Sequence, residues 1–167
     1  MRTMFLAAAA ALLPLAAEAQ PLELALAAEL AAGPEEVWTT IGNFHDMSWH
    51  PAVFATDGEG DATAGATRVL TLGEEGGPTI SESLDARDEA GMSYTYHITE
   101  VDPAVLPVTG YSSTLAITAR EDGGASVTWT GTFEPAEGTS AEDAAAAVEG
   151  VYRGGLDALA ERFGAAE

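Results

Sequence analysis

Alternating apolar residues mark the start of the first predicted strand. Every second residue from Leu22 to Leu30 is apolar, and the residues between them are glutamate or alanine. Side chains of a strand point alternately to its two faces, so this period of two predicts a strand with one buried face. A Gly-Pro pair at 33–34 ends the pattern, and the glutamates at 35 and 36 suit the positively polarised first turn of a helix. We therefore expect a short helix from residue 34 to about residue 42.

Acidic turns that contain glycine divide the middle of the chain into segments of strand length. The turns fall at residues 57–60, 74–77, 88–91 and 121–124, a spacing typical of consecutive hairpins in an antiparallel sheet. Strands are expected near residues 53–57, 66–73, 79–87, 92–101, 109–120 and 125–134. From Ser140 the chain is rich in alanine, and Ser140 with Asp143 forms an approximate capping box for a helix that runs to about residue 163.

The order of these elements predicts the fold class. One strand, a short helix and six further strands come before the long helix, and the apolar face of the sheet must be covered. The long C-terminal helix is the only predicted element large enough to cover it. Its own apolar face consists of Ala144, Val148, Val151, Tyr152, Gly155, Leu156, Leu159 and Phe163. We expect an α+β protein with a helix-grip fold, in which a seven-stranded curved antiparallel sheet wraps around the C-terminal helix.

The first nineteen residues have the features of a secretory signal. Arg2 gives a positive start, residues 4–17 form an apolar run, and Ala17-Glu18-Ala19 is a typical cleavage site. The run is shorter than the roughly 20 residues that a membrane span needs, and no later segment is long or apolar enough. We expect cleavage after Ala19, a periplasmic or secreted protein without a membrane span, and a single domain over residues 20–167.

The charge of the chain narrows the classes of partner. Six basic residues, all arginines, stand against 27 acidic ones, and the formal net charge is −21. Such a charge repels phosphate backbones and anionic lipid headgroups, so we expect no nucleic acid partner. The acidity serves either solubility or a basic partner protein. The absence of cysteine excludes disulfides and thiolate metal sites, and no nucleotide-binding or hydrolase motif occurs.

Several polar residues fall on the face of the sheet that should meet the helix. Strand parity places Arg68 and Glu82 there, together with Tyr94, Tyr96 and Tyr111. A buried polar group without a partner costs about 1–3 kcal/mol, so a tightly packed apolar core would not normally admit so many. Two explanations remain open for the charged residues. They form a structural ion pair between neighbouring strands, or they orient a polar group of a ligand.

The connection at residues 43–51 is rich in aromatic residues and contains two histidines. His45, Asp46 and His50 lack the i,i+4 histidine pair and the clear third ligand of a metal site, so we expect no metal and no cofactor. His50 is a candidate general base because a histidine beside a pocket can titrate near neutral pH. Alternatively, Trp49 and His50 belong to a rim or lid over a cavity. His97 has outward parity.

Three glycines inside the last predicted helix require an explanation. Each of Gly150, Gly154 and Gly155 weakens a helix by roughly 1 kcal/mol relative to alanine. Either the helix approaches the sheet closely at these positions, or the missing side chains leave room for a ligand.

An ordered set of short segments resembles a known family. The segments are Val37-Trp38, Ile41-Gly42-Asn43-Phe44, Trp49-His50-Pro51, residues 65–70, Glu82-Ser83-Leu84, Tyr94-Thr95-Tyr96, residues 107–111, residues 129–133 and residues 152–156. Together they resemble the polyketide cyclase/dehydrase branch of the START-like, or SRPBCC, superfamily. The resemblance covers residues 20–167 nearly completely and implies a ligand cavity between the sheet and the C-terminal helix. The signal segment, the Trp-His-Pro motif and the inward Arg68 and Glu82 are similar to MxaD-like periplasmic proteins, which implies an accessory role beside a quinoprotein methanol dehydrogenase and its cytochrome.

These observations predict a ligand-binding or accessory protein that is not an enzyme. The expected ligand is a small hydrophobic or aromatic molecule, with Arg68 and Glu82 orienting its polar group. The expected ligand-binding residues are Trp49, His50, Arg68, Leu70, Glu82, Tyr94, Tyr96, Tyr111, Trp129, Phe133, Tyr152 and Leu156. One alternative is a cyclase or dehydratase in which His50 or Glu82 removes a proton and Arg68 stabilises an enolate. Another is a protein that docks on a basic periplasmic redox partner.

Overall fold

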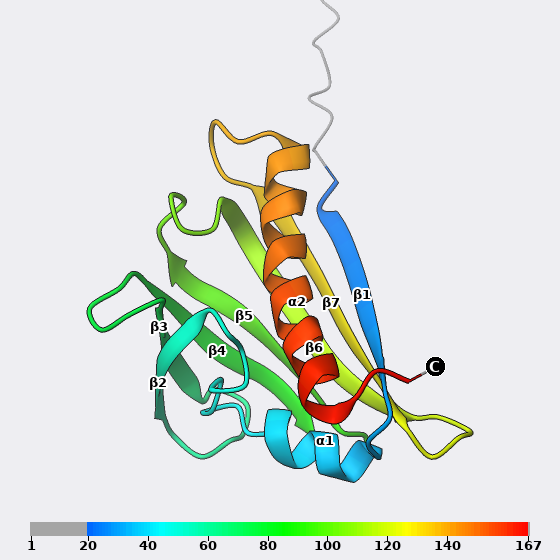
Figure 1. The fold of residues 1–167 in the computed structure, drawn as a ribbon. Coiled ribbons are helices and arrows are strands. Elements are labelled where there is room, and N and C mark those ends of the chain that lie inside the picture. Colours follow the sequence, from blue (N-terminus) through cyan, green and yellow to red (C-terminus); the bar gives the residue numbers. More distant parts are fainter. Residues whose placement is uncertain (1–19, 167) are drawn as a thin grey trace, which may run out of the picture.

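The computed structural model describes residues 20–166 and shows every element that the sequence predicts (Figure 1). Element ends coincide with the predicted ones or differ from them by at most two residues. The elements in chain order are β1 (Leu22–Leu30), α1 (Pro34–Ile41), β2 (Val53–Glu59), β3 (Thr67–Leu72), β4 (Thr79–Asp88), β5 (Ser93–Val101), β6 (Val108–Ala119), β7 (Ala125–Pro135) and α2 (Ala141–Phe163). The predicted signal segment at residues 1–19 lies outside the described residues.

The seven strands form one antiparallel sheet in the order β1-β7-β6-β5-β4-β3-β2. Strands β2 to β7 pair with their neighbours in sequence, and β1 joins the far side of β7, so the first strand pairs with the last. Figure 1 shows α2 lying across one face of this curved sheet, with α1 beside the C-terminal end of α2. The predicted α+β helix-grip arrangement is therefore confirmed.

The N-terminal cap of α2 has the geometry that the sequence predicts. The Ser140 hydroxyl accepts a hydrogen bond from the backbone N–H of Asp143 at 3.0 Å and donates one to the carboxylate of the same residue at 2.7 Å. This cap satisfies a backbone donor that a helix start otherwise leaves unpaired. Within residues 20–166, no helix is both long and apolar enough to cross a membrane.

The core lies between the inner face of the sheet and α2. Alternate residues of strands β3 to β7 are buried there, and α2 contributes Ala144, Val148, Tyr152, Gly155, Leu156 and Leu159. The predicted strand parity is correct for the charged residues as well, since Arg68 and Glu82 are 1% and 5% exposed. They are direct partners in the β3–β4 register, which places both charged groups inside the protein.

Candidate functional site

A partly enclosed cavity of about 80 Å³ lies between the inner face of the sheet, α2 and the connection that follows α1. Most of its wall is apolar, and Glu82 is the one carboxylate among the described residues that line it. The lining residues are Met47, His50, Ala52, Val53, Leu70, Leu72, Ile80, Glu82, Tyr96, Ile98, Leu106, Tyr111, Trp129 and Val151. This mixture of apolar walls and a few placed polar groups is typical of small-molecule sites.

Glu82 is held by a buried ion pair. Its Oε2 accepts a hydrogen bond from Nε of Arg68 at 2.5 Å, and Nη1 of Arg68 donates to the backbone oxygen of Phe44 at 2.7 Å. The guanidinium also lies 4.2 Å from the centre of the Phe44 ring and 5.0 Å from that of Tyr96. Burial raises the pKa of Glu82, and the positive charge of Arg68 opposes that rise. Arg68 thus neutralises Glu82 from behind and does not itself line the cavity.

His50 closes one side of the cavity and contacts α2 directly. Its Nδ1 accepts a hydrogen bond from the backbone N–H of Ala52 at 3.2 Å, so Nε2 carries the proton that is donated to the carbonyl of Val151 at 3.0 Å. Burial is the main cause that lowers the pKa of His50, and the charge of Arg68 lowers it further. The neutral imidazole therefore has both nitrogens engaged with the backbone.

The aromatic floor of the cavity forms one hydrogen-bonded network. The rings of Trp129 and Tyr152 stack with their centres 4.6 Å apart, and Nε1 of Trp129 donates to the hydroxyls of Ser113 at 2.9 Å and Tyr96 at 3.2 Å. The Tyr152 hydroxyl lies 2.9 Å from both the Ser113 and the Tyr111 hydroxyls. Burial raises the pKa of Tyr96, Tyr111 and Tyr152, so all three tyrosines are neutral.

Two glycines permit this packing. A β-carbon on Gly131 of β7 would collide with the Tyr152 hydroxyl. A β-carbon on Gly155 of α2 would lie 2.7 Å from Cδ2 of His50 and 2.8 Å from Cζ3 of Trp129. By contrast, nothing lies within 4 Å of the corresponding position at Gly150 or Gly154. Close packing therefore explains Gly155, the position that lets the His50 ring reach the Val151 carbonyl.

The residues expected from the sequence to bind a ligand divide into two layers. His50, Leu70, Glu82, Tyr96, Tyr111 and Trp129 line the cavity. Trp49, Arg68, Tyr94, Phe133, Tyr152 and Leu156 are buried behind these residues and do not line it. Sequence reasoning did not assign Ala52, Val53 and Leu106 to the wall. Strand parity alone gives no signal for Ala52 and Leu106, because both lie in connections outside the strands.

The histidines and the aspartate of the connection do not come together as metal ligands. Asp46 accepts a hydrogen bond from the backbone of Ser48, both nitrogens of His50 contact the backbone, and Nε2 of His45 is buried without a partner. Within residues 20–166, no three His, Asp or Glu side chains are grouped as a metal ion would require. His97 lies on the outer face, as predicted, where Nδ1 pairs with the carboxylate of Asp85 at 2.7 Å.

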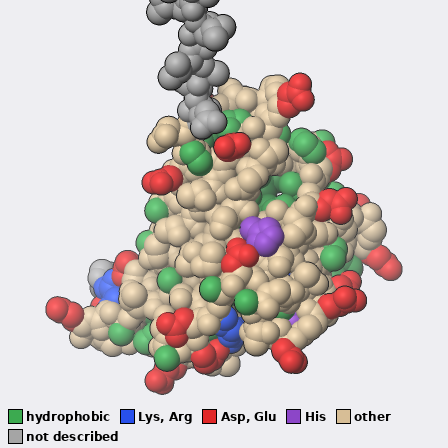
Figure 2. Space-filling model, turned by 180° about the vertical axis from the view of Figure 1, so that it is seen from behind, with side chains coloured by type: hydrophobic (Ala, Val, Ile, Leu, Met, Phe, Trp, Pro, Cys, Tyr) green, Lys and Arg blue, Asp and Glu red, His purple; other side chains and the backbone are tan. Residues whose placement is uncertain are grey.

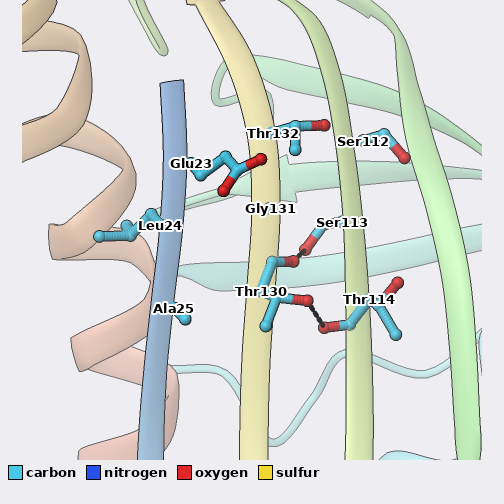
Figure 3. Close-up of a pocket in the computed structure, with 9 residues that line it drawn as sticks. All are labelled: Glu23, Leu24, Ala25, Ser112, Ser113, Thr114, Thr130, Gly131 and Thr132. Carbon is cyan, nitrogen blue, oxygen red and sulfur yellow. Dashed lines mark hydrogen bonds between the residues drawn. The ribbon is translucent and has the colours of Figure 1, made fainter. Parts of the chain in front are cut away.

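A wider hollow of about 440 Å³ lies over β1, β7 and β6 (Figure 3). Most of its wall is formed by short side chains, and it is open to solvent. Figure 2 shows this side of the molecule, where the acidic side chains lie mainly near the edge of the view. Ser113 and Thr130, which line the hollow, use their hydroxyls on backbone oxygens of the sheet itself. We assign the ligand site to the smaller inner cavity because it is more enclosed than the hollow, has mostly apolar walls and contains a buried carboxylate.

Comparisons with known proteins identify the family and agree with the fold. A family model described as polyketide cyclase / dehydrase and lipid transport matches residues 22–164. Among solved structures, the protein XoxI from Bacillus cereus is 31% identical, with a TM-score of 0.75 over 84% of this chain and 94% of that one. A protein from Thermobifida fusca is 34% identical, with a TM-score of 0.72 over 85% of this chain and 93% of that one. A protein from Nitrosospira multiformis is 28% identical, with a TM-score of 0.72 over 85% and 96%. No curated protein matches the sequence.

Proposed function

Because the chain belongs to the polyketide cyclase / dehydrase and lipid transport family, as its resemblance to the SRPBCC superfamily predicts, we propose that it binds a small, largely apolar molecule in the inner cavity and does not transform it. The observation that carries this proposal is the cavity itself. It is bounded mainly by apolar side chains from the sheet, α2 and the connection, and Glu82, the one carboxylate among the described residues that line it, is paired with Arg68. Such walls bind by excluding water, while a few polar groups fix orientation.

The size of the cavity limits what it accepts as it stands. An apolar cavity of about 150 Å³ in another protein binds benzene or xenon, and the present cavity is about 80 Å³. The stacked rings of Trp129 and Tyr152 pack between the sheet and the helix next to this cavity. A molecule smaller than benzene fits without rearrangement. A larger ligand requires the connection around His50 to move away from α2.

The alternative of a cyclase or dehydratase requires a free base beside the ligand. His50 does not meet this requirement, since one nitrogen accepts from Ala52 and the other donates to Val151. Glu82 faces the cavity, but its Oε2 is bonded to Arg68 at 2.5 Å, and the positive charge of Arg68 opposes the rise in pKa that burial causes. The geometry therefore favours binding over proton abstraction.

Xenon is a suitable probe of the proposal because it is inert, apolar and small. We expect xenon to shift backbone amide signals of residues around the cavity, such as Ile98 and Leu106, in two-dimensional NMR spectra of the protein purified after expression of the full sequence. Val53→Phe should fill the cavity and abolish these shifts. The matched control Val69→Phe changes an outer-face residue, 37% exposed, on the neighbouring strand, and should retain them. Equal xenon shifts in both variants would contradict the proposal.

Native mass spectrometry of the same protein, before and after denaturation, tests for a natural ligand. A discrete added mass that disappears on denaturation identifies the ligand class. Export is part of the proposal and rests on the signal-like residues 1–19. An intact mass equal to that of residues 20–167 would support cleavage after Ala19. An uncleaved chain found in the cytoplasm would contradict export.

A second candidate function is docking on a basic redox protein of the periplasm. It is favoured by the surface charge, since Arg87, Arg120 and Arg153 are each paired with neighbouring carboxylates while the chain carries a net charge of −21. Association driven by such a field accelerates steeply as salt is lowered. Under the MxaD-like assignment, genes for a quinoprotein methanol dehydrogenase and its cytochrome should lie beside this one. Their absence would remove the support for this candidate.

A further inference from the structure

The directions of the hydrogen bonds beneath the cavity follow from counting protons. The Ser113 hydroxyl has one proton and donates it to the backbone oxygen of Thr130 at 2.7 Å, so it accepts from both Trp129 and Tyr152. The Tyr152 hydroxyl donates its one proton to Ser113. In the 2.9 Å contact between Tyr152 and Tyr111, Tyr111 must therefore be the donor. The protons of Trp129, Tyr111 and Tyr152 are therefore all committed within the protein.

Two polar groups at the cavity remain uncommitted after this count. The Tyr96 hydroxyl accepts from Trp129 at 3.2 Å, and its own proton has no acceptor among residues 20–166. Glu82 uses Oε2 for Arg68, and its Oε1 likewise has no hydrogen-bond partner within the described part of the chain. Both residues line the cavity from neighbouring strands, in the register that pairs Glu82 with Ile98 and Leu84 with Tyr96. The cavity thus presents one strong acceptor and one donor from two neighbouring strands.

We propose that the inner cavity selects a neutral molecule with a hydroxyl group on a small apolar body. The hydroxyl donates to Oε1 of Glu82 and accepts from the hydroxyl of Tyr96, while the body contacts the apolar wall formed by residues such as Leu70, Ile98 and Val151. This inference rests on the proposed binding function and defines its ligand class. A hydroxyl both donates and accepts through one atom, so it satisfies both groups at once.

Charge and size exclude other ligand classes. The Arg68 guanidinium behind Glu82 makes the pair neutral overall, so a protonated amine would lose its hydration without a compensating net charge. A carboxylate would face Oε1 of Glu82 and be repelled. The volume of about 80 Å³ is well below what a long-chain lipid needs, and the branched three-carbon body of propan-2-ol is of suitable size.

Four probes that share a three-carbon skeleton test the inference. Propan-2-ol offers a donor and an acceptor, acetone an acceptor alone, 2-chloropropane neither, and 2-aminopropane a positive charge at neutral pH. Binding is measured by titration of the protein expressed from the full sequence, with the indole N–H signals read by NMR. The Trp129 indole bonds to Tyr96 and should shift. The Trp38 indole, which bonds to Glu89 at 2.8 Å, serves as an internal control.

We expect propan-2-ol to shift the Trp129 signal and to bind at least about fivefold more tightly than acetone, 2-chloropropane or 2-aminopropane, the ratio expected for one hydrogen bond. Tyr96→Phe removes the free donor but leaves Trp129 bonded to Ser113, and should weaken propan-2-ol binding by about fivefold. Tyr94→Phe is the matched control, because Tyr94 is equally buried, at 2% exposed, but does not line the cavity. It should bind propan-2-ol as the original protein does.

The outcomes separate this inference from the proposed function. The hydroxyl selectivity would be overturned by equal affinity for propan-2-ol and 2-chloropropane, by tighter binding of 2-aminopropane, or by equal losses of affinity in the two tyrosine variants. Xenon binding would still support the proposed binding function in each of these cases. Binding of decan-1-ol without binding of propan-2-ol would overturn the size limit. If neither xenon nor any of these probes binds, both the inference and the proposed function fail.

Discussion

Two adjacent glycines of α2 should respond differently to the same substitution, alanine. Alanine is favoured over glycine inside a helix by about 1 kcal/mol. At Gly154 no atom lies within 4 Å of an added β-carbon, so Gly154→Ala should raise the free energy of unfolding by about 1 kcal/mol. At Gly155 the added carbon would lie 2.7 Å from His50 and 2.8 Å from Trp129, well inside the normal carbon–carbon contact of about 3.5–4.0 Å.

The expected change in the free energy of unfolding at Gly155 is the difference between the overpacking cost and the gain in helix propensity. Overpacking of this kind costs about 1–3 kcal/mol, which offsets or exceeds the gain in helix propensity of about 1 kcal/mol. Gly155→Ala should therefore leave the free energy of unfolding unchanged or lower it by up to about 2 kcal/mol. The two variants should differ by about 1–3 kcal/mol, a difference equal to the overpacking cost alone.

Urea unfolding, followed by tryptophan fluorescence and far-ultraviolet circular dichroism, measures this difference. With a slope of about 2 kcal/mol per molar urea, the midpoints of the two variants should be separated by about 0.5–1.5 M. The slope itself should stay constant, so that the shift reports stability alone. If Gly155→Ala stabilises the protein as much as Gly154→Ala does, the contact of α2 with His50 and Trp129 does not constrain this position and the reasoning is refuted.

Two further predictions concern the buried charges. Glu82→Gln leaves the Arg68 guanidinium buried without its counter-ion and should lower the free energy of unfolding, measured in urea, by about 3 kcal/mol. The control Glu149→Gln removes an exposed ion pair with Arg153 on α2 and should leave the urea midpoint unchanged. Similar losses in both variants would argue against a structural role for the buried pair. Because burial lowers the pKa of His50, this residue binds a proton more readily in the unfolded chain than in the folded protein. Its contribution therefore lowers the free energy of unfolding as the pH drops below 6.5. The decline measured between pH 7 and pH 5.5 should be smaller in His50→Gln than in the original protein; an equal decline in both would contradict the assignment.

The sequence alone predicted the elements and the orientation of the strands. The alternation of residues 22–30, the glycine turns and the Ser140 cap are local features, and they depend only on backbone geometry and on which side chains avoid water. The same alternation placed Arg68 and Glu82 on the inner face, because a strand has only two faces and their neighbours at every second position are buried. Family membership was predicted from the same ordered segments and is confirmed by the match over residues 22–164.

The composition of the cavity wall was decided by the tertiary structure. Arg68 and Glu82 share a face of the sheet, as do Tyr94 and Tyr96, but in each pair only the second residue lines the cavity. Parity cannot separate them, because it gives the face of the sheet on which a side chain lies and not which part of that face borders an open space. His50 finds its partner Val151 at a separation of 101 residues, a contact that exists only after α2 packs on the sheet. Local physics therefore determined which residues are buried, and the packing of distant segments decided which of those buried residues face an open space.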